Sequence, residues 1–216
     1  MVDYGLKDRV ALITGANNPQ GIGATTAFAF ACEGAKVVLV YKRIPRPFDK
    51  TKTDRNGADR YFQANAGNAD VVESKIQEMG ADYLIIESDI SNEDAVKDIY
   101  AAILERYGRI INLSTDAAQV FVGQITYGAS KATLEALTRS IALEVAKYGI
   151  TVNAVAPGPT QTGWIDDDFA KEVIPIIPMG KLIQPQDIAE TILFLASEQA
   201  KMIAGQVIKI SGGHAL

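Results

Sequence analysis

The chain has 216 residues, of which 48% are hydrophobic and 22% charged, and its formal net charge is −5. This length and composition are typical of one soluble globular domain spanning residues 1–216. The acidic balance argues against nucleic acid as a partner, because nucleic-acid-binding surfaces are basic. With one cysteine the chain cannot form an internal disulfide, which is typical of a cytoplasmic protein. No apolar run is long enough to indicate a membrane span.

Strand-like and helix-like segments alternate along the chain. Short β-branched runs occupy residues 9–15, 36–41, 83–88, 109–114, 149–158 and 205–211. Most of them are apolar at consecutive positions, as expected for strands that are covered on both faces. The alternation therefore predicts an α/β fold of the Rossmann type, a doubly wound parallel sheet with helices on both faces.

The first strand-like run leads into the glycine-rich stretch "TGANNPQGIG". Glycines at this point let the backbone turn tightly and approach a pyrophosphate, while the following helix offers free N–H groups. A flexible turn is the competing interpretation. The position between the first strand and the first helix favours a dinucleotide site that includes Gly15, Gly21, Ile22 and Gly23.

The second strand-like run ends in "VVLVYKRIPR", which contains no carboxylate. An acidic residue here would bind the ribose hydroxyl of NAD, whereas basic residues favour the ribose phosphate of NADP. Lys42 and Arg43 therefore favour NADP(H), although NAD(H) remains possible and a solvated basic turn is the alternative.

A long segment follows, residues 43–68, with six Lys or Arg against three Asp and no sustained periodicity. It is predicted to be irregular, either as a surface insertion or as a lid or oligomer contact near the ligand.

Helical patterns follow the third and fourth strand-like runs. Ser91 and Asp94 predict a capping box at the start of residues 91–108. In residues 127–149 an apolar stripe falls on one face, which predicts contact with the core; its members are Leu134, Leu137, Ile141 and Val145. Pro185 suits the first turn of a further helix.

Tyr127 and Lys131 are one helical turn apart in "YGASK", so their side chains share a face. A tyrosine has an ordinary pKa of about 10 and can donate a proton at neutral pH. A neighbouring ammonium favours the phenolate and brings the tyrosine closer to working pH. Simple surface packing is the competing interpretation.

Taken together, the glycine turn, "YGASK", a preceding hydroxyl and "NAVAPGPTQTGW" resemble the classical short-chain dehydrogenases/reductases, and the resemblance covers nearly the whole chain. It implies an NADPH-dependent oxidoreductase that acts on a ketone or secondary alcohol, with 3-oxoacyl thioesters as one candidate class.

The resemblance implies that Tyr127, Lys131 and Ser114 are catalytic, although Thr115 is an alternative to Ser114 when residues are counted forward along the strand. The resemblance further implies cofactor contacts from Tyr127 and Lys131 and from Asp89, Ile90, Pro157, Gly158, Thr160 and Thr162. It implies no metal, and a homodimer or homotetramer.

The sequence departs from the family pattern in two ways. The glycine turn is two residues longer than usual, and the family's fourth strand with its following helix is missing, a loss of about 40 residues. The expected join lies at about residues 107–110. This loss supports an alternative function, a catalytically inactive nucleotide-binding regulator or scaffold. His214, the single histidine, has no evident partner in the sequence and is predicted to have no role.

Overall fold

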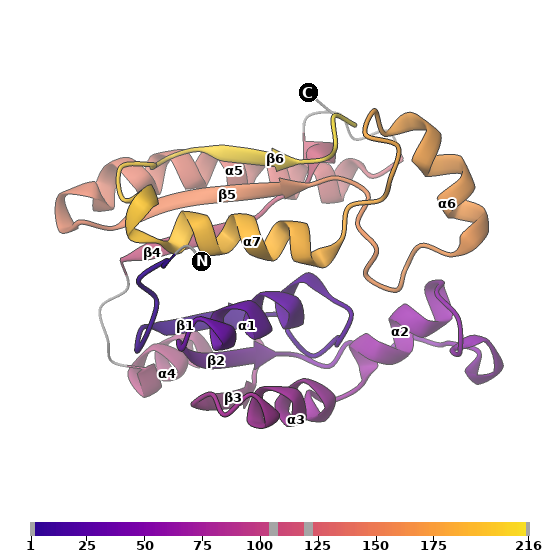
Figure 1. Ribbon diagram of the computed structural model, residues 1–216, viewed down its shortest axis with the longest axis horizontal. Coiled ribbons are helices and arrows are strands. Elements are labelled where there is room, and N and C mark those ends of the chain that lie inside the picture. Colours follow the sequence, from indigo (N-terminus) through magenta and orange to yellow (C-terminus); the bar gives the residue numbers. More distant parts are fainter. Residues whose placement is uncertain (1–2, 104–107, 119–122, 215–216) are drawn as a thin grey trace. The chain divides into compact units, whose positions relative to one another are not determined.

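The computed structural model describes residues 3–103, 108–118 and 123–214 (Figure 1). The chain divides into two compact units. The N-terminal unit comprises residues 6–106 with 162–167, and the C-terminal unit comprises residues 1–5, 107–161 and 168–216. Among the described residues, no helix combines the length and apolar character needed to cross a membrane.

The N-terminal unit has a three-stranded parallel sheet in the order β1–β2–β3. Val38 of the central strand lies between Leu12 and Leu84 in the register. Residues 37–41 of this strand are buried and pack with α1, while α3 packs against α1 and β3; Ala27 of α1 and Ile76 of α3 are buried. Its elements are β1 (Val10–Thr14), α1 (Ile22–Cys32), β2 (Lys36–Tyr41), the 3-10 turn Lys50–Lys52, α2 (Ala58–Ala66), α3 (Asp70–Glu78), β3 (Tyr83–Glu87) and α4 (Glu93–Ile103).

The C-terminal unit has a second three-stranded parallel sheet in the order β4–β5–β6. Every residue of the central strand is buried, and Ile188 and Leu195 of α7 complete the apolar core. Its elements are β4 (Arg109–Leu113), α5 (Ile125–Val145), β5 (Thr151–Pro157), α6 (Asp167–Val173), α7 (Pro185–Ala196), β6 (Val207–Ile210) and the 3-10 turns Asp116–Ala118, Ala146–Tyr148, Ile174–Ile176 and Glu198–Ala200.

The predicted α/β class with parallel strands is confirmed, and each of the six strand-like runs contains a strand. The sheet differs from the prediction, because among the described strands β1 pairs only with β2 and β4 only with β5. Strands β1 and β4 therefore each have one edge that pairs with no described strand. The expected join at 107–110 includes Tyr107, which lies outside the described residues.

The segment at residues 43–68 was predicted to be irregular, and this is wrong. It contains α2, which begins after Gly57 and ends at Gly67. The predicted capping box at Ser91 is also wrong. Asn92 caps α4, since its Oδ1 accepts hydrogen bonds from the N–H groups of Asp94 at 2.9 Å and Ala95 at 3.4 Å.

The predicted core face of α5 is likewise wrong. Leu137 and Ile141 are 49% and 37% exposed. The buried face of this helix instead consists of Gly128, Glu135, Thr138 and Ala142. Polar side chains can occupy it because they find buried partners, as when Asn112 Nδ2 donates to Thr138 Oγ1 at 2.9 Å.

Candidate active and cofactor sites

The glycine turn of the N-terminal unit leaves no room for larger side chains. Gly15 has a φ of +69°, and a Cβ on Gly23 would lie 2.7 Å from the carbonyl oxygen of Gly15. Gly21 precedes α1 and adds no side-chain cap, and the first turn of the helix has no acidic residue. A close backbone turn at an uncapped helix N-terminus fits the pyrophosphate of a dinucleotide.

Side-chain amides hold the enlarged part of this turn. Asn17 Nδ2 donates to the carbonyl oxygens of Gly67 at 2.9 Å and Asn65 at 3.2 Å. Asn18 Oδ1 accepts the backbone N–H of Gln20 at 3.0 Å. Both asparagines are buried. The two extra residues are therefore part of an ordered loop that is tied to the end of α2.

The basic residues that follow β2 are paired with carboxylates from the end of β3. Arg43 Nε lies 2.7 Å from Glu87 Oε1, and Lys42 Nζ forms an ion pair with Asp89. Hydrogen bonds, chiefly from Lys42 and then from Ser91, lower the pKa of Asp89 to about 2. The sequence at the end of β2 contains no carboxylate. Glu87 and Asp89 come from a distant segment and are brought to this site by the parallel register, which places Tyr41 beside Glu87.

Asp89 and Ile90 were expected to flank the adenine. Asp89 Oδ1 accepts hydrogen bonds from the Ser91 N–H at 3.1 Å and the Ser91 hydroxyl at 2.7 Å. Ile90 is 51% exposed, so its apolar side chain is open to a ligand. These contacts fix the turn between β3 and α4 in the N-terminal unit.

In the C-terminal unit, Tyr127 and Lys131 lie in the first two turns of α5. Lys131 Nζ donates to the carbonyl oxygen of Leu113 at 2.7 Å and lies 5.8 Å from the centre of the Tyr127 ring. Burial lowers the pKa of Lys131. Tyr127 is 46% exposed. Lys131 is therefore positioned by the end of β4, and the Tyr127 side chain one turn away is exposed.

The two candidate hydroxyls after β4 have different surroundings. Ser114 is 3% exposed and its Oγ donates to Glu135 Oε1 at 2.8 Å. Thr115 is half-buried and its Oγ1 accepts the N–H of Ala117 at 3.3 Å. The hydroxyl proton of Ser114 is thus engaged with a buried carboxylate.

The turn after β5 is closely packed. A Cβ on Gly158 would lie 2.9 Å from both Asp116 Oδ2 and Ser211 Cα. Thr160 Oγ1 donates to the carbonyl oxygen of Gly158 at 2.8 Å. Contrary to expectation, His214 has a partner, because its Nδ1 lies 2.8 Å from Asp116 Oδ2. The partners are 98 positions apart in the sequence, so no local pattern indicated this contact.

The predicted site residues fall into two sets, one in each unit. The C-terminal unit contains Tyr127 and Lys131 on α5, and Ser114, Pro157, Gly158 and Thr160 at or after the carboxyl ends of β4 and β5. The N-terminal unit contains Gly15, Gly21, Ile22, Gly23, Lys42, Arg43, Asp89, Ile90 and Thr162. Thr162 joins the N-terminal unit through its carbonyl oxygen, which accepts Asn18 Nδ2 at 3.3 Å.

Comparison with known proteins indicates the family of the chain. Residues 95–215 match the model of a family described as enoyl-(acyl carrier protein) reductase. A 3-oxoacyl-[acyl-carrier-protein] reductase of Synechocystis is 32% identical over 242 positions, covering 96% of this chain and 97% of that protein. The corresponding Staphylococcus aureus reductase FabG is 34% identical over 239 positions, covering 94% and 96%. A crystal structure of a short-chain type dehydrogenase/reductase from Mycobacterium marinum superposes with a TM-score of 0.75 at 23% identity, covering 97% and 96% of the two chains.

The chain belongs to the short-chain dehydrogenase/reductase family, a class of NAD(P)-dependent oxidoreductases. It is shorter than its relatives in at least one internal region. The alignment with the Synechocystis protein has 242 positions and includes 96% of this chain, about 207 of its 216 residues, so about 35 positions, 242 less 207, face a gap.

Proposed function

We propose that this protein is an NADPH-dependent carbonyl reductase or alcohol dehydrogenase in which Tyr127 is the acid/base. The observation that carries the proposal is the pair at the start of α5. Lys131 is held by the carbonyl oxygen of Leu113 at 2.7 Å, one turn from an accessible phenol. The names of the two relatives favour a 3-oxoacyl thioester as substrate.

Reduction of a ketone needs a hydride at carbon and a proton at oxygen. The nicotinamide supplies the hydride when bound. The Tyr127 hydroxyl donates the proton to the carbonyl oxygen, and the Lys131 ammonium stabilises the phenolate that remains. Partial burial strengthens this electrostatic effect because less water screens the charge. Oxidation of the alcohol uses the same groups in reverse.

A hydroxyl after β4 would orient the substrate carbonyl. Both Ser114 and Thr115 remain candidates. The contacts favour Thr115, because Ser114 is buried and donates to Glu135. On this proposal Ser114 is a positioning residue that links the end of β4 to α5, and the Thr115 hydroxyl faces the substrate.

For the rest of the molecule, we propose a single cytoplasmic domain that assembles into a homodimer or homotetramer and prefers NADP(H) to NAD(H). The apolar residues exposed on α5, Leu137 and Ile141, support self-association. The basic residues after β2 support the cofactor preference only in part, since both are paired with carboxylates.

The test is turnover of NADPH with a panel of ketones and 3-oxoacyl thioesters. Tyr127→Phe removes the proton donor, and we expect kcat to fall at least ~100-fold, the usual contribution of a positioned acid. Tyr148→Phe, an exposed tyrosine at the other end of the helix, is the matched control and should keep full activity. Full activity of Tyr127→Phe would contradict the proposal. In the same assay Thr115→Val should lose more activity than Ser114→Ala.

A second candidate function is nucleotide binding without turnover. The free edges of β1 and β4 favour it, because among the described strands each pairs on one side only. The shortage of about 35 positions relative to the Synechocystis protein, 242 less 207, points the same way. Cofactor binding by calorimetry, without oxidation of NADPH on any substrate of the panel, would establish this alternative.

A further inference from the structure

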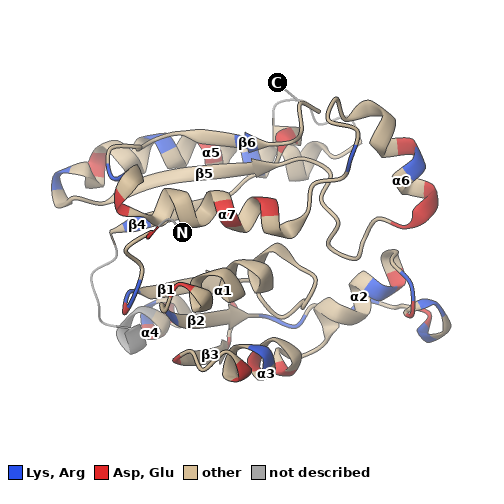
Figure 2. Cartoon of the chain, viewed as in Figure 1, with Lys and Arg blue, Asp and Glu red and all other residues tan. Residues whose placement is uncertain are grey.

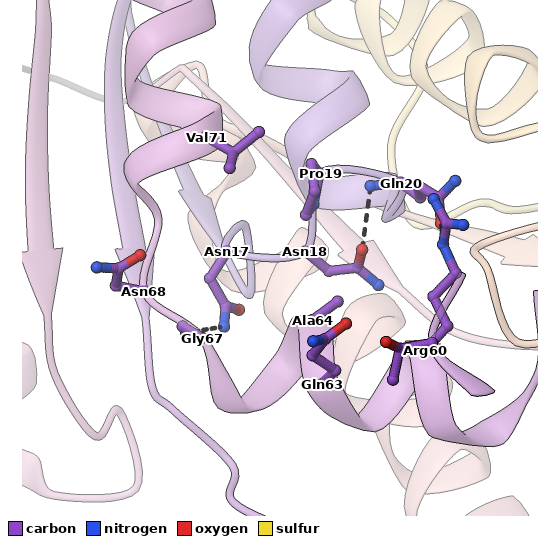
Figure 3. Close-up of a pocket in the computed structure, with 11 residues that line it drawn as sticks. Asn17, Asn18, Pro19, Gln20, Arg60, Gln63, Ala64, Gly67, Asn68 and Val71 are labelled. Atoms are coloured by element: carbon purple, nitrogen blue, oxygen red, sulfur yellow. Dashed lines mark hydrogen bonds between the residues drawn. The ribbon is translucent and has the colours of Figure 1, made fainter. Parts of the chain in front are cut away.

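The N-terminal unit has a pocket between the glycine turn and α2 (Figure 3). Its volume is about 330 Å³. Residues 17–20 of the turn form one wall, and residues of α2 and the segment around it form the other. Five of the eleven lining residues have amide side chains, and Arg60 is the one charged residue among the described residues that line the pocket.

Arg60 is fixed by neutral acceptors. Its Nε donates to Gln20 Oε1 at 2.9 Å, and its Nη1 donates to the carbonyl oxygen of Asp54 at 3.2 Å. It forms no ion pair with any described residue. The nearest acidic neighbour in the chain, Asp59, instead accepts the backbone N–H of Asp49 at 2.8 Å. The guanidinium is therefore oriented in advance, half-buried, and has donors left over for an anion.

The sequence predicts that Lys42 and Arg43 bind the cofactor phosphate. In the structure both form ion pairs, Lys42 with Asp89 and Arg43 with Glu87. A phosphate at that position would meet two carboxylates as well as two cations, so like-charge repulsion would cancel much of the attraction. Arg60 offers a phosphate a charge-assisted, geometrically defined contact without that repulsion.

We propose that this pocket takes the phosphate ester on the adenosine ribose of NADP(H), with Arg60 as the cation that selects it. The inference rests on the proposed dinucleotide function of the glycine turn. Gln20, which precedes Gly21 in that turn, is also the residue that holds Arg60. The segment at residues 43–68 would thus determine cofactor specificity.

Calorimetry with adenosine 2′,5′-bisphosphate and with 5′-AMP tests this proposal without requiring turnover. We expect the native protein to bind the bisphosphate more tightly. Arg60→Gln should weaken bisphosphate binding about tenfold and leave 5′-AMP binding unchanged, because one charge-assisted contact to the extra phosphate is lost. Arg60→Lys should restore part of the preference. Arg55→Gln, an exposed arginine of the same segment outside the pocket lining, is the matched control and should have no effect.

Equal weakening of both ligands by Arg60→Gln, or no weakening, would overturn the inference, as would absence of a preference in the native protein. Loss of the preference in a Lys42→Gln/Arg43→Gln variant but not in Arg60→Gln would also overturn it and place the phosphate at the end of β2. If the native protein shows the Arg60-dependent preference but oxidises no NADPH, the binding site stands and the proposed enzymatic function fails.

Discussion

At the residue scale, the pKa of Asp89 is lowered to about 2, chiefly by the hydrogen bond from Lys42. Its ionised form stabilises the folded state above the ordinary pKa of about 3.9. That contribution is lost as the pH falls from about 4 towards 2.

Lys42→Gln should therefore raise the pKa of Asp89 towards its ordinary range, which NMR titration of the carboxyl carbon would measure. The hydrogen bonds from Ser91 remain in this variant and should keep part of the shift. Lys36→Gln, an exposed lysine at the opposite end of β2, is the control. An unchanged pKa in Lys42→Gln would show that the ion pair does not form in solution.

At the element scale, α2 and the segment 162–167 belong to the same unit and share an aromatic cluster. The Trp164 ring centre lies 5.4 Å from that of Tyr61 and 5.8 Å from that of Phe62. The Gly57 N–H also donates to the carbonyl oxygen of Gly163 at 2.8 Å. The helix that lines the pocket is therefore anchored at its start, as well as at its end near the glycine turn.

Trp164→Ala should release this anchor and destabilise the N-terminal unit by about 2 kcal/mol, since aromatic pairs contribute roughly 0.5–1.5 kcal/mol each beyond buried area. Hydrogen exchange of the α2 amides should accelerate, and thermal unfolding should begin earlier. Trp164→Phe keeps an aromatic ring and should retain most of the stability. If exchange in α2 were unaffected by Trp164→Ala, the cluster would not hold the helix.

At the scale of the whole molecule, charge and exposed apolar surface bear on assembly. Acidic and basic residues are interspersed along α3, α5 and α6, unlike the one-sided basic face of a nucleic-acid-binding helix (Figure 2). Helix α5 also exposes apolar side chains on the face that contains Leu137 and Ile141. An exposed apolar stripe of this kind typically marks a surface that associates with another chain.

We expect light scattering to show a dimer or tetramer. Leu137→Glu should shift it towards the monomer, because a charge in an apolar interface must be desolvated. Leu143→Glu, on another face of α5, is the matched control and should keep the native mass. A monomeric native protein would exclude this role for α5.

Much of the fold was evident in the sequence because it depends on local patterns. The six strands follow from runs of consecutive apolar residues, and the start of α7 follows from Pro185, which lies at its first position. The face of α5 could not be predicted from its apolar residues alone. Its buried positions include Glu135 and Thr138, whose polar partners Ser114 and Asn112 come from β4.

The sequence by itself determined the class of fold, the family, and the spacing of Tyr127 and Lys131, since these depend on composition, periodicity and motifs along one stretch of chain. Only the tertiary structure decided which charges meet. Parallel pairing of β2 with β3 brings Glu87 and Asp89 to Lys42 and Arg43, and packing of α2 on the glycine turn brings Arg60 to Gln20. These contacts join residues that are 40 to 47 positions apart in the chain, so no local pattern could predict them.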